Sequence, residues 1–468
     1  MADVYLIYSR RDPRAVEVAR QLAAALEPRW TVWFDAMIVG DFVVAIRREM
    51  AIARCAIPIW SASSEDSQSV RDELDLAKRQ GVGMLPAMAE PCDAPYGYGQ
   101  LSMVDLQGWD GNEGHPGYRE LLRKLELAVP RREAPRRPAA VAGISLPSMF
   151  LSVSSHETRL KPLEAITALR LFGVKTVLVS AYDLHPSRRP EGAMSELAKL
   201  RGNGATVLVD SGNYEAYRRS DETWTSSEFV VALQDVPCDH ILSFDVLEAS
   251  RDPVIAARDV VAAATRDAAA SAKSVIPIVH APSDGAGSFD LRDLPQVVRE
   301  VAEQLEPMFI AIPERELGPG LMQSAATVKR IRWELDKLPF YQPIHLLGTG
   351  HPWSIAIFAA AGADSFDGLE WCRVVADGAT GTLHHFQHFD FFSYQAAASS
   401  SDITVQAFAD PRVDFAGKVA FHNLDVLTSF ARELQEFAGT NRLEALVRER
   451  LGRDNSAELV ARVPELFR

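Results

Sequence analysis

The sequence has few cysteines and no long apolar run. Its four cysteines, Cys55, Cys92, Cys238 and Cys372, lie far apart and form no Cys-x-x-Cys pair. This spacing predicts neither a disulfide framework nor a standard cysteine-ligated zinc site. No apolar stretch reaches the roughly 18 residues of a membrane span, and no basic segment followed by an apolar one opens the chain, so we expect a cytoplasmic protein without membrane contact.

Positively charged residues are also fewer than negatively charged ones. The 468 residues include 49 Lys and Arg against 63 Asp and Glu, which gives a formal net charge of −14. This balance argues against a large nucleic-acid interface, although a local basic face is compatible with it. Apolar residues make up 47% of the chain, which is ordinary for a globular protein, and the length allows about two to four domains.

Strand-like and helical stretches alternate through residues 1–128. Runs with the composition of strands lie at 4–8, 31–34, 55–60 and 82–88, and helical stretches lie at 12–26, 42–53 and after residue 69. The alternation predicts an α/β fold, a flavodoxin-like doubly wound parallel sheet. Ligands bind such sheets at the carboxyl ends of the strands, where we expect Tyr8, Ser9, Arg10, Phe34, Asp35 and Ser61 to meet the helix that carries Glu73.

Glu73 is a candidate catalytic residue. We predict that its helix starts with Ser69 as the N-cap and Asp72 as the capping-box partner. At about 100° per residue, the carboxylate of Glu73 falls inside or beside the apolar face of that helix. An acid near a helix N-terminus, favoured by the helix dipole, is the simpler interpretation; a half-buried catalytic carboxylate is the alternative.

Residues 1–128 resemble a Toll/interleukin-1 receptor (TIR) domain. The resemblance rests, in order, on Tyr5-Leu6-Ile7-Tyr8-Ser9, Val32-Trp33-Phe34-Asp35, Gly40-Asp41, Pro58-Ile59-Trp60-Ser61 and Ser69-Val70-Arg71-Asp72-Glu73-Leu74. Many bacterial TIR domains cleave NAD+ at the nicotinamide–ribose bond with one glutamate, which maps onto Glu73. The resemblance implies that NAD+ is a substrate and that Tyr8, Ser9, Arg10, Phe34, Asp35, Gly40, Asp41 and Ser61 bind it. A TIR domain that only assembles with partners is the alternative.

Residues 129–146 have the composition of an exposed linker. Prolines stiffen this stretch, and its arginines at 131, 132, 136 and 137 keep it solvated. Contact of these arginines with phosphate is the alternative interpretation.

Eight strand-like runs recur through residues 147–395, with helical segments between them. They lie at 150–153, 176–180, 206–209, 240–243, 275–279, 309–312, 344–347 and 365–366. Eight strand–helix units predict a TIM barrel, followed at 396–468 by a helical tail with helices at 424–437 and 442–451 that packs on the barrel. Three acids, Asp210, Asp245 and Asp367, would then stand with His280 at the carboxyl face, where barrel enzymes carry their chemistry.

This second region resembles the queuine tRNA-ribosyltransferases. The matching motifs are Val209-Asp210-Ser211-Gly212-Asn213-Tyr214, Ser243-Phe244-Asp245, Gly348-Thr349-Gly350, Gly362-Ala363-Asp364-Ser365-Phe366-Asp367 and Phe421-His422-Asn423-Leu424. The resemblance implies that Asp367 is the nucleophile, Asp210 the general acid/base and Asp245 a partner of the base edge. The remaining candidate ligand-binding residues of the barrel are Ser211, Gly212, Asn213, His280, Gly348, Gly350 and Arg373.

The departures from that family concern the ligand and the metal. Asn213 replaces a glycine, Gly368 replaces a cysteine, and the zinc cysteines expected between Arg373 and His422 are missing. His384, His388 and His422 are weak candidates for a replacement site, and we expect no zinc. The ligand of the barrel therefore stays open between a free purine, a nucleotide and a nucleic acid, bound by an enzyme or by a sensor.

Three functions are compatible with this organisation. The first is a TIR-domain NAD+ glycohydrolase in anti-phage defence, with the barrel as sensor and self-association through the TIR domain. The second is a base-exchange ribosyltransferase acting on nucleic acid, with the TIR domain as an assembly scaffold. The third is a signalling adaptor without catalysis.

Overall fold

The computed structural model describes residues 3–26, 30–34, 42–112, 114–129, 135–156, 158–245, 247–285 and 287–467. The chain divides into two compact units, Met1–Ala134 and Pro135–Arg468, so the division falls inside the stretch predicted as a linker. Within the described ranges, no helix combines the length and the apolar character that crossing a membrane requires.

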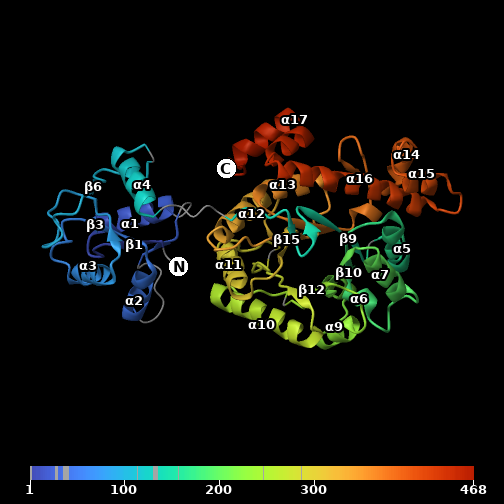
Figure 1. Ribbon diagram of the computed structural model, residues 1–468, viewed down its shortest axis with the longest axis horizontal. Coiled ribbons are helices and arrows are strands. Elements are labelled where there is room, and N and C mark those ends of the chain that lie inside the picture. The colour runs from blue at the N-terminus through green and yellow to red at the C-terminus, as the bar shows by residue number, and fades with distance from the viewer. Residues whose placement is uncertain are drawn as a thin grey trace. The chain divides into compact units, whose positions relative to one another are not determined.

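The first unit is the predicted doubly wound sheet (Figure 1). Its strands are β1 (Val4–Ile7), β2 (Val32–Trp33), β3 (Cys55–Trp60), β4 (Gly83–Met84), β5 (Ala87–Met88) and β6 (Val104–Asp105). They pair in parallel in the order β2-β1-β3-β5-β6, with β4 also on β3. This is the flavodoxin-like strand order.

Helices cover both faces of this sheet. They are α1 (Pro13–Leu26), α2 (Phe42–Ile52), α3 (Gln68–Gln80) and α4 (Pro116–Ala128). Residues of α1 and α4 pack with Val4 and Leu6 of β1, whereas residues of α2 and α3 pack with Tyr5 and Ile7. Alternation along β1 thus assigns neighbouring side chains to opposite faces.

Two predictions about this unit were wrong in detail. The N-cap of α3 is Ser67, whose side chain accepts a hydrogen bond from the Val70 N–H, so Ser69 lies inside the helix and no capping box with Asp72 forms. The single strand predicted at 82–88 is two short strands, because Pro86 between them has no N–H to donate to a ladder. Strand β6 and helix α4 were not predicted.

The second unit is the predicted TIM barrel, and all eight predicted strands are present. They are β9 (Ser148–Val153), β10 (Thr176–Ser180), β11 (Thr206–Asp210), β12 (His240–Leu242), β13 (Ser274–Ile276), β14 (Ile310–Pro313), β15 (Ile344–Leu347) and β16 (Ser365–Gly368). The sheet order is β13-β12-β11-β10-β9-β16-β15-β14. Backbone hydrogen bonds of 2.9 Å from the Val279 N–H to the Ala311 carbonyl, and from the Ala311 N–H to the Pro277 carbonyl, close it.

Helices line the outside of the barrel (Figure 1). The longer ones are α5 (Pro162–Phe172), α7 (Ala193–Gly202), α10 (Pro253–Ser271), α11 (Leu294–Leu305), α12 (Leu321–Leu335) and α13 (Pro352–Ala361), and the shorter ones are α6 (Ala181–Leu184), α8 (Asn213–Arg219) and α9 (Ser226–Leu233). Inside, the side chains of Phe150, Leu178, Leu208 and Phe309 pack with Ile144 of a hairpin formed by β7 (Ala140–Val141) and β8 (Ile144–Ser145). This apolar layer fills the end of the barrel next to the hairpin, and the polar carboxyl ends of the strands form the opposite end.

The linker prediction was wrong for its second half. Arg137 donates hydrogen bonds to the Asp364 carboxylate at 2.6 Å and to the carbonyls of Ala359 and Ala363 at 2.9 Å. Asp364 is fully buried and also accepts hydrogen bonds from Arg332 and Tyr341. A buried carboxylate requires such donors, so Arg137 is a structural part of the second unit. The chain from Arg137 through the β7–β8 hairpin therefore belongs to the barrel unit.

The C-terminal region is helical, as predicted. It comprises α14 (Phe389–Ala397), α15 (Asp402–Ala409), α16 (Phe415–Gly439) and α17 (Leu443–Arg462), and the short strands β17 (Val375–Ala376) and β18 (Leu383–His384) precede it. The predicted boundary at 395/396 was wrong, because α14 runs through it. Leu424, Leu427, Phe430 and Leu434 of α16 pack into the core of the barrel unit, which confirms the predicted packing.

Candidate functional site

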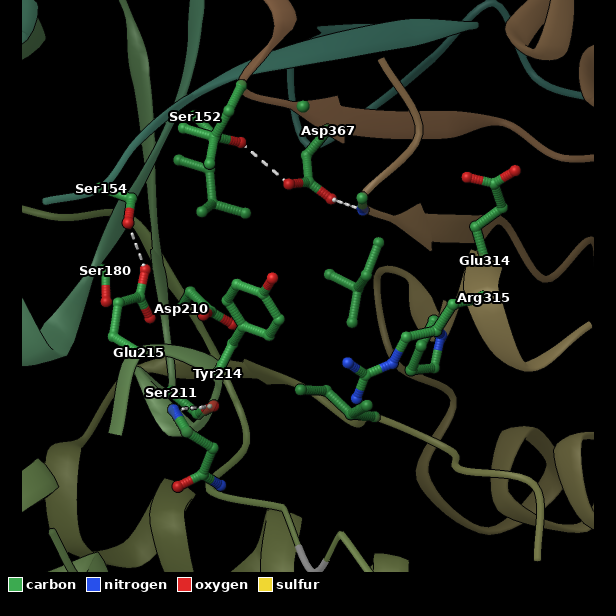
Figure 2. A pocket seen from close by; sticks show the side chains of 18 of the residues that line it. Ser152, Ser154, Ser180, Asp210, Ser211, Tyr214, Glu215, Glu314, Arg315 and Asp367 are labelled. Atoms are coloured by element: carbon green, nitrogen blue, oxygen red, sulfur yellow. Dashed lines mark hydrogen bonds between the residues drawn. The ribbon is translucent and has the colours of Figure 1, made fainter. Parts of the chain in front are cut away.

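A cavity of about 330 Å³ opens at the carboxyl ends of the barrel strands. Its lining contains Asp210, Asp245 and Asp367 together with His280, as the sequence predicted for a barrel mouth. Figure 2 shows Asp210 and Asp367 in the pocket. The other predicted ligand-binding residues that line it are Ser211, Asn213, Gly348 and Arg373. The barrel thus gathers predicted residues that are as many as 163 positions apart in sequence, since Asp210 and Arg373 both line the cavity.

Asp367 stands on β16 with its carboxylate held by two donors. The Ser152 hydroxyl donates to Oδ2 at 2.8 Å, and the Gly348 N–H donates to Oδ1 at 2.9 Å (Figure 2). His345 Nε2 lies 3.5 Å from Oδ1, at the distance of an ion pair if the imidazole is protonated. These contacts fix the orientation of the Asp367 side chain toward the cavity.

Asp210 ends β11 in a markedly acidic surrounding. Burial raises its pKa well above the usual range, and the negative charges of Glu215, Asp245 and Asp367 raise it further. One hydrogen bond, from the Gly212 N–H at 3.3 Å, opposes this trend. A carboxyl group with a raised pKa holds its proton near neutral pH, which is the state that a general acid needs.

Asp245 is part of a buried chain of charged groups. Burial acts to raise its pKa, but hydrogen bonds from His280 and Asn213 outweigh burial, and the pKa is lowered. Burial lowers the pKa of His280 in turn, but the carboxylates of Asp245 and Glu316 outweigh it and raise that pKa to about 10. His280 is therefore an imidazolium that bonds Asp245 through Nε2 and Glu316 through Nδ1, the latter at 3.0 Å.

Two glycines of the predicted site make room for their neighbours. A Cβ at Gly212 would lie 2.7 Å from the Tyr182 nitrogen, and the φ of +76° is itself unfavourable for other residues. A Cβ at Gly350 would lie 1.6 Å from Oε2 of Glu370, whose carboxyl group also lines the cavity. Burial raises the pKa of Glu370.

Sequence reasoning missed several residues that contact the predicted ones. They are Ser152 and His345 beside Asp367, Glu215 beside Asp210, and Glu316 beside His280. Glu316 follows the end of β14 by three residues, so its position after a strand was the one available signal. Asn213, which was predicted as a ligand-binding residue and departs from the family's glycine, donates from its amide to the Asp245 carboxylate at 2.8 Å.

In the first unit, Glu73 is half-buried on α3, and the Tyr5 hydroxyl donates to its Oε2 at 3.1 Å. The Tyr5 ring is buried and stacks on Trp33 with a centroid distance of 4.5 Å. The placement of the Glu73 carboxylate against an aromatic layer agrees with the helical-face prediction. Its partner, Tyr5, comes from the middle of β1 and was not predicted to have a functional role.

The other residues predicted to bind NAD+ divide between two places. Tyr8 and Phe34 belong to the apolar cluster on the α1 face, opposite the cluster that contains Tyr5. Ser9 and Ser61 are buried at the carboxyl ends of β1 and β3, where the Ser63 hydroxyl donates to Ser9 at 3.0 Å. Arg10 is exposed. The remaining predicted residues, Asp35, Gly40 and Asp41, lie outside the described residues.

The three histidines named as weak metal candidates contact other parts of the chain, and the expectation of no zinc stays a prediction. His422 Nε2 lies 2.8 Å from the Ala376 carbonyl, and His384 Nε2 lies 2.9 Å from the Thr382 hydroxyl. His388 is exposed beside Phe391. Across the described ranges, no group of three or more His, Cys, Asp or Glu side chains could hold a metal ion.

Comparison with known proteins identifies both parts. Residues 4–122 match the family model of the TIR domain, so the first unit is a TIR domain. The rest of the chain is similar to archaeal tRNA-guanine(15) transglycosylases. Those of Archaeoglobus fulgidus, Haloferax volcanii and Haloarcula marismortui are 22%, 22% and 24% identical over 290, 329 and 343 residues.

The matched stretches cover 60%, 67% and 69% of this chain and 59%, 61% and 65% of the respective relatives. The chain thus spans less than two thirds of the length of the curated relatives it matches. It joins a TIR domain to a transglycosylase-like barrel, which confirms both resemblances.

Proposed function

We propose that the TIR domain cleaves NAD+ at Glu73, as the effector half of an anti-phage protein whose barrel binds a regulatory ligand. The observation that carries this proposal is the Glu73 carboxylate itself, half-buried and oriented by the Tyr5 hydroxyl. Partial burial strengthens its interaction with a developing positive charge. Self-association through the TIR domain forms part of the proposal and rests on the general behaviour of such domains.

The proposed reaction breaks the bond between the ribose C1′ and the nicotinamide nitrogen. Nicotinamide leaves with the electron pair, and the carboxylate of Glu73 stabilises the positive charge that develops on the ribose. Water then adds at C1′ and releases a proton, which gives ADP-ribose. The substrate carries the leaving group in cationic form, so no general acid is needed for its departure.

The test is release of nicotinamide by the purified full chain, followed by chromatography. Glu73→Gln keeps the size of the side chain but removes its charge, and we expect it to abolish release. Asp72→Asn is the matched control, because Asp72 is the preceding acid of the same helix and is exposed. Equal activity in the wild type and Glu73→Gln would remove Glu73 from the mechanism.

The barrel supports a second candidate function, glycosyl transfer with exchange of a base. The favouring observation is the contrast between Asp367, held by two donors, and Asp210, whose pKa is raised. In this scheme Asp367 forms a bond to the ribose C1′ while the C1′–N bond breaks, and Asp210 gives its proton to the leaving base. The entering base reverses both steps.

This candidate is tested by incorporation of labelled guanine into RNA. Asp367→Asn is expected to abolish incorporation, and the conservative replacement distinguishes loss of the nucleophile from loss of the pocket. Incorporation by the wild type but not by Asp367→Asn would establish the barrel as an enzyme. Ligand binding without incorporation would leave the barrel as the regulatory module.

A further inference from the structure

A second polar cluster lies beside Asp367, on the side of the cavity formed by β9 and β10. Ser152 and Ser154 are two residues apart, so they face the same side of the chain about 7 Å apart. Ser152 donates to Asp367, and Ser154 donates to Oε1 of Glu215 at 2.6 Å. Figure 2 shows Glu215 with Ser154 and Ser180 on one side of the pocket, next to Asp210.

Two buried polar atoms in this cluster have no partner among the described residues. They are Oε2 of Glu215 and Oγ of Ser180, and both residues line the cavity. Glu215 is only 4% exposed and Ser180 only 1%. Burying a carboxylate oxygen without a hydrogen bond is costly, so a donor from a ligand would relieve that cost.

The negative charge of Glu215 determines which chemical group of a ligand can bind beside it. Glu215 helps raise the pKa of Asp210 and also that of Asp183, which burial first of all raises to about 6. Arg219 donates to Ser155 on the outer side of the cluster, and the two arginines that line the cavity, Arg315 and Arg373, belong to other segments than the Glu215 cluster. A phosphate placed against Glu215 would be repelled by its carboxylate, whereas a hydroxyl group can donate to Oε2, which has no hydrogen-bond partner among the described residues. Carboxylates accept hydrogen bonds from ribose hydroxyls in this way in dinucleotide-binding folds.

We propose that Glu215 accepts a hydrogen bond from the 2′-hydroxyl of a ribonucleoside whose C1′ faces Asp367, and that the Ser180 hydroxyl donates one to the same 2′-oxygen. The 2′-carbon adjoins C1′. Asp367 and Glu215 accept hydrogen bonds from Ser152 and Ser154, which are two residues apart, so the two carboxylates line neighbouring parts of the cavity. Glu215 is then a specificity-determining residue that selects ribonucleosides over 2′-deoxyribonucleosides. The proposal deepens the ligand-binding role of the barrel and rests on it.

The experiment measures binding of guanosine and 2′-deoxyguanosine to the full chain by titration calorimetry. The two probes share a base and differ only in the 2′-hydroxyl, so the ratio of their dissociation constants isolates that group. A hydrogen bond to a charged acceptor predicts that the wild type binds guanosine about tenfold or more tightly. Glu215→Ala should bring the ratio close to one, with little change in binding of 2′-deoxyguanosine.

Two further variants complete the test. Ser180→Ala removes one hydrogen-bonding group without changing charge, and it should lower the ratio even if Glu215→Ala fails to fold. Glu222→Ala, at an exposed acid of the same region, should keep the wild-type ratio. Equal affinities in the wild type, no binding of either nucleoside, or an unchanged ratio in both Glu215→Ala and Ser180→Ala would overturn the proposal. Nicotinamide release and guanine incorporation in the same preparations report on the proposed functions independently, because neither readout enters the ratio.

Discussion

Replacing His280 by glutamine should remove one specific part of the pH dependence of barrel stability. His280 is 6% exposed, and its pKa of about 10 compares with an ordinary value near 6.5. Because the folded-state pKa is the higher one, the stabilisation is fully present below about pH 6.5 and is lost as the pH rises toward 10. Over that window the free energy of unfolding should fall by about 1.4 kcal/mol per pH unit, or about 5 kcal/mol in all.

The assay is urea unfolding of the full chain at pH 7.5 and pH 9.0, with the barrel transition read by pulse proteolysis. At about 1.4 kcal/mol per pH unit, the free energy of unfolding of the wild type should fall by about 2 kcal/mol more than that of His280→Gln between the two pH values. The variant should also be less stable at pH 7.5, because Asp245 and Glu316 then lose the imidazolium between them, and Arg315, 3.7 Å from Glu316, is the cation that stays. His388→Gln, at an exposed histidine, is the control. If the free energy of unfolding of the wild type and of His280→Gln fell by the same amount between the two pH values, the assignment of His280 as an imidazolium would be refuted.

Two further predictions concern the contacts that position each unit's chemistry. Tyr5→Phe removes the donor to Glu73 while keeping the ring stacked on Trp33, so nicotinamide release should fall about tenfold or more with unchanged circular dichroism. Unchanged release would show that the Tyr5 hydroxyl does not orient Glu73. Arg137→Ala removes three hydrogen bonds at the base of the barrel and should lower its unfolding free energy by about 1.5–3 kcal/mol, as measured in urea, whereas Arg136→Ala, at an exposed residue, should have a smaller effect.

The strands of the barrel were predictable because each is a short apolar run followed by a polar residue. The runs that led to β10 and β15 match the structure at both ends. Asp210 and Asp367 could be placed together for the same reason, since parallel strands of a barrel end at one face. The short strands β4, β5 and β6 have two residues each, too few for any periodicity to appear.

The partners of the site residues were not predictable, because they depend on contacts between distant segments. No sequence feature near His280 indicates that Glu316 contacts its ring at Nδ1, opposite the nitrogen that bonds Asp245. Arg137 was expected in solvent because its neighbours are prolines and arginines, yet the buried carboxylate of Asp364 holds it. Glu215 lies on α8 beside a recognised motif, but only the folded barrel shows that one of its oxygens has no partner among the described residues.

The most direct test of the central claim is the fate of NAD+ incubated with the purified full chain, with and without an extract of phage-infected cells. The account predicts release of nicotinamide that depends on Glu73, either at all times or only after the extract is added. If release required the extract, this result would favour the barrel as the part of the protein that binds the activating ligand. If the folded protein left NAD+ intact under both conditions, the assignment of Glu73 as a catalytic residue would be contradicted.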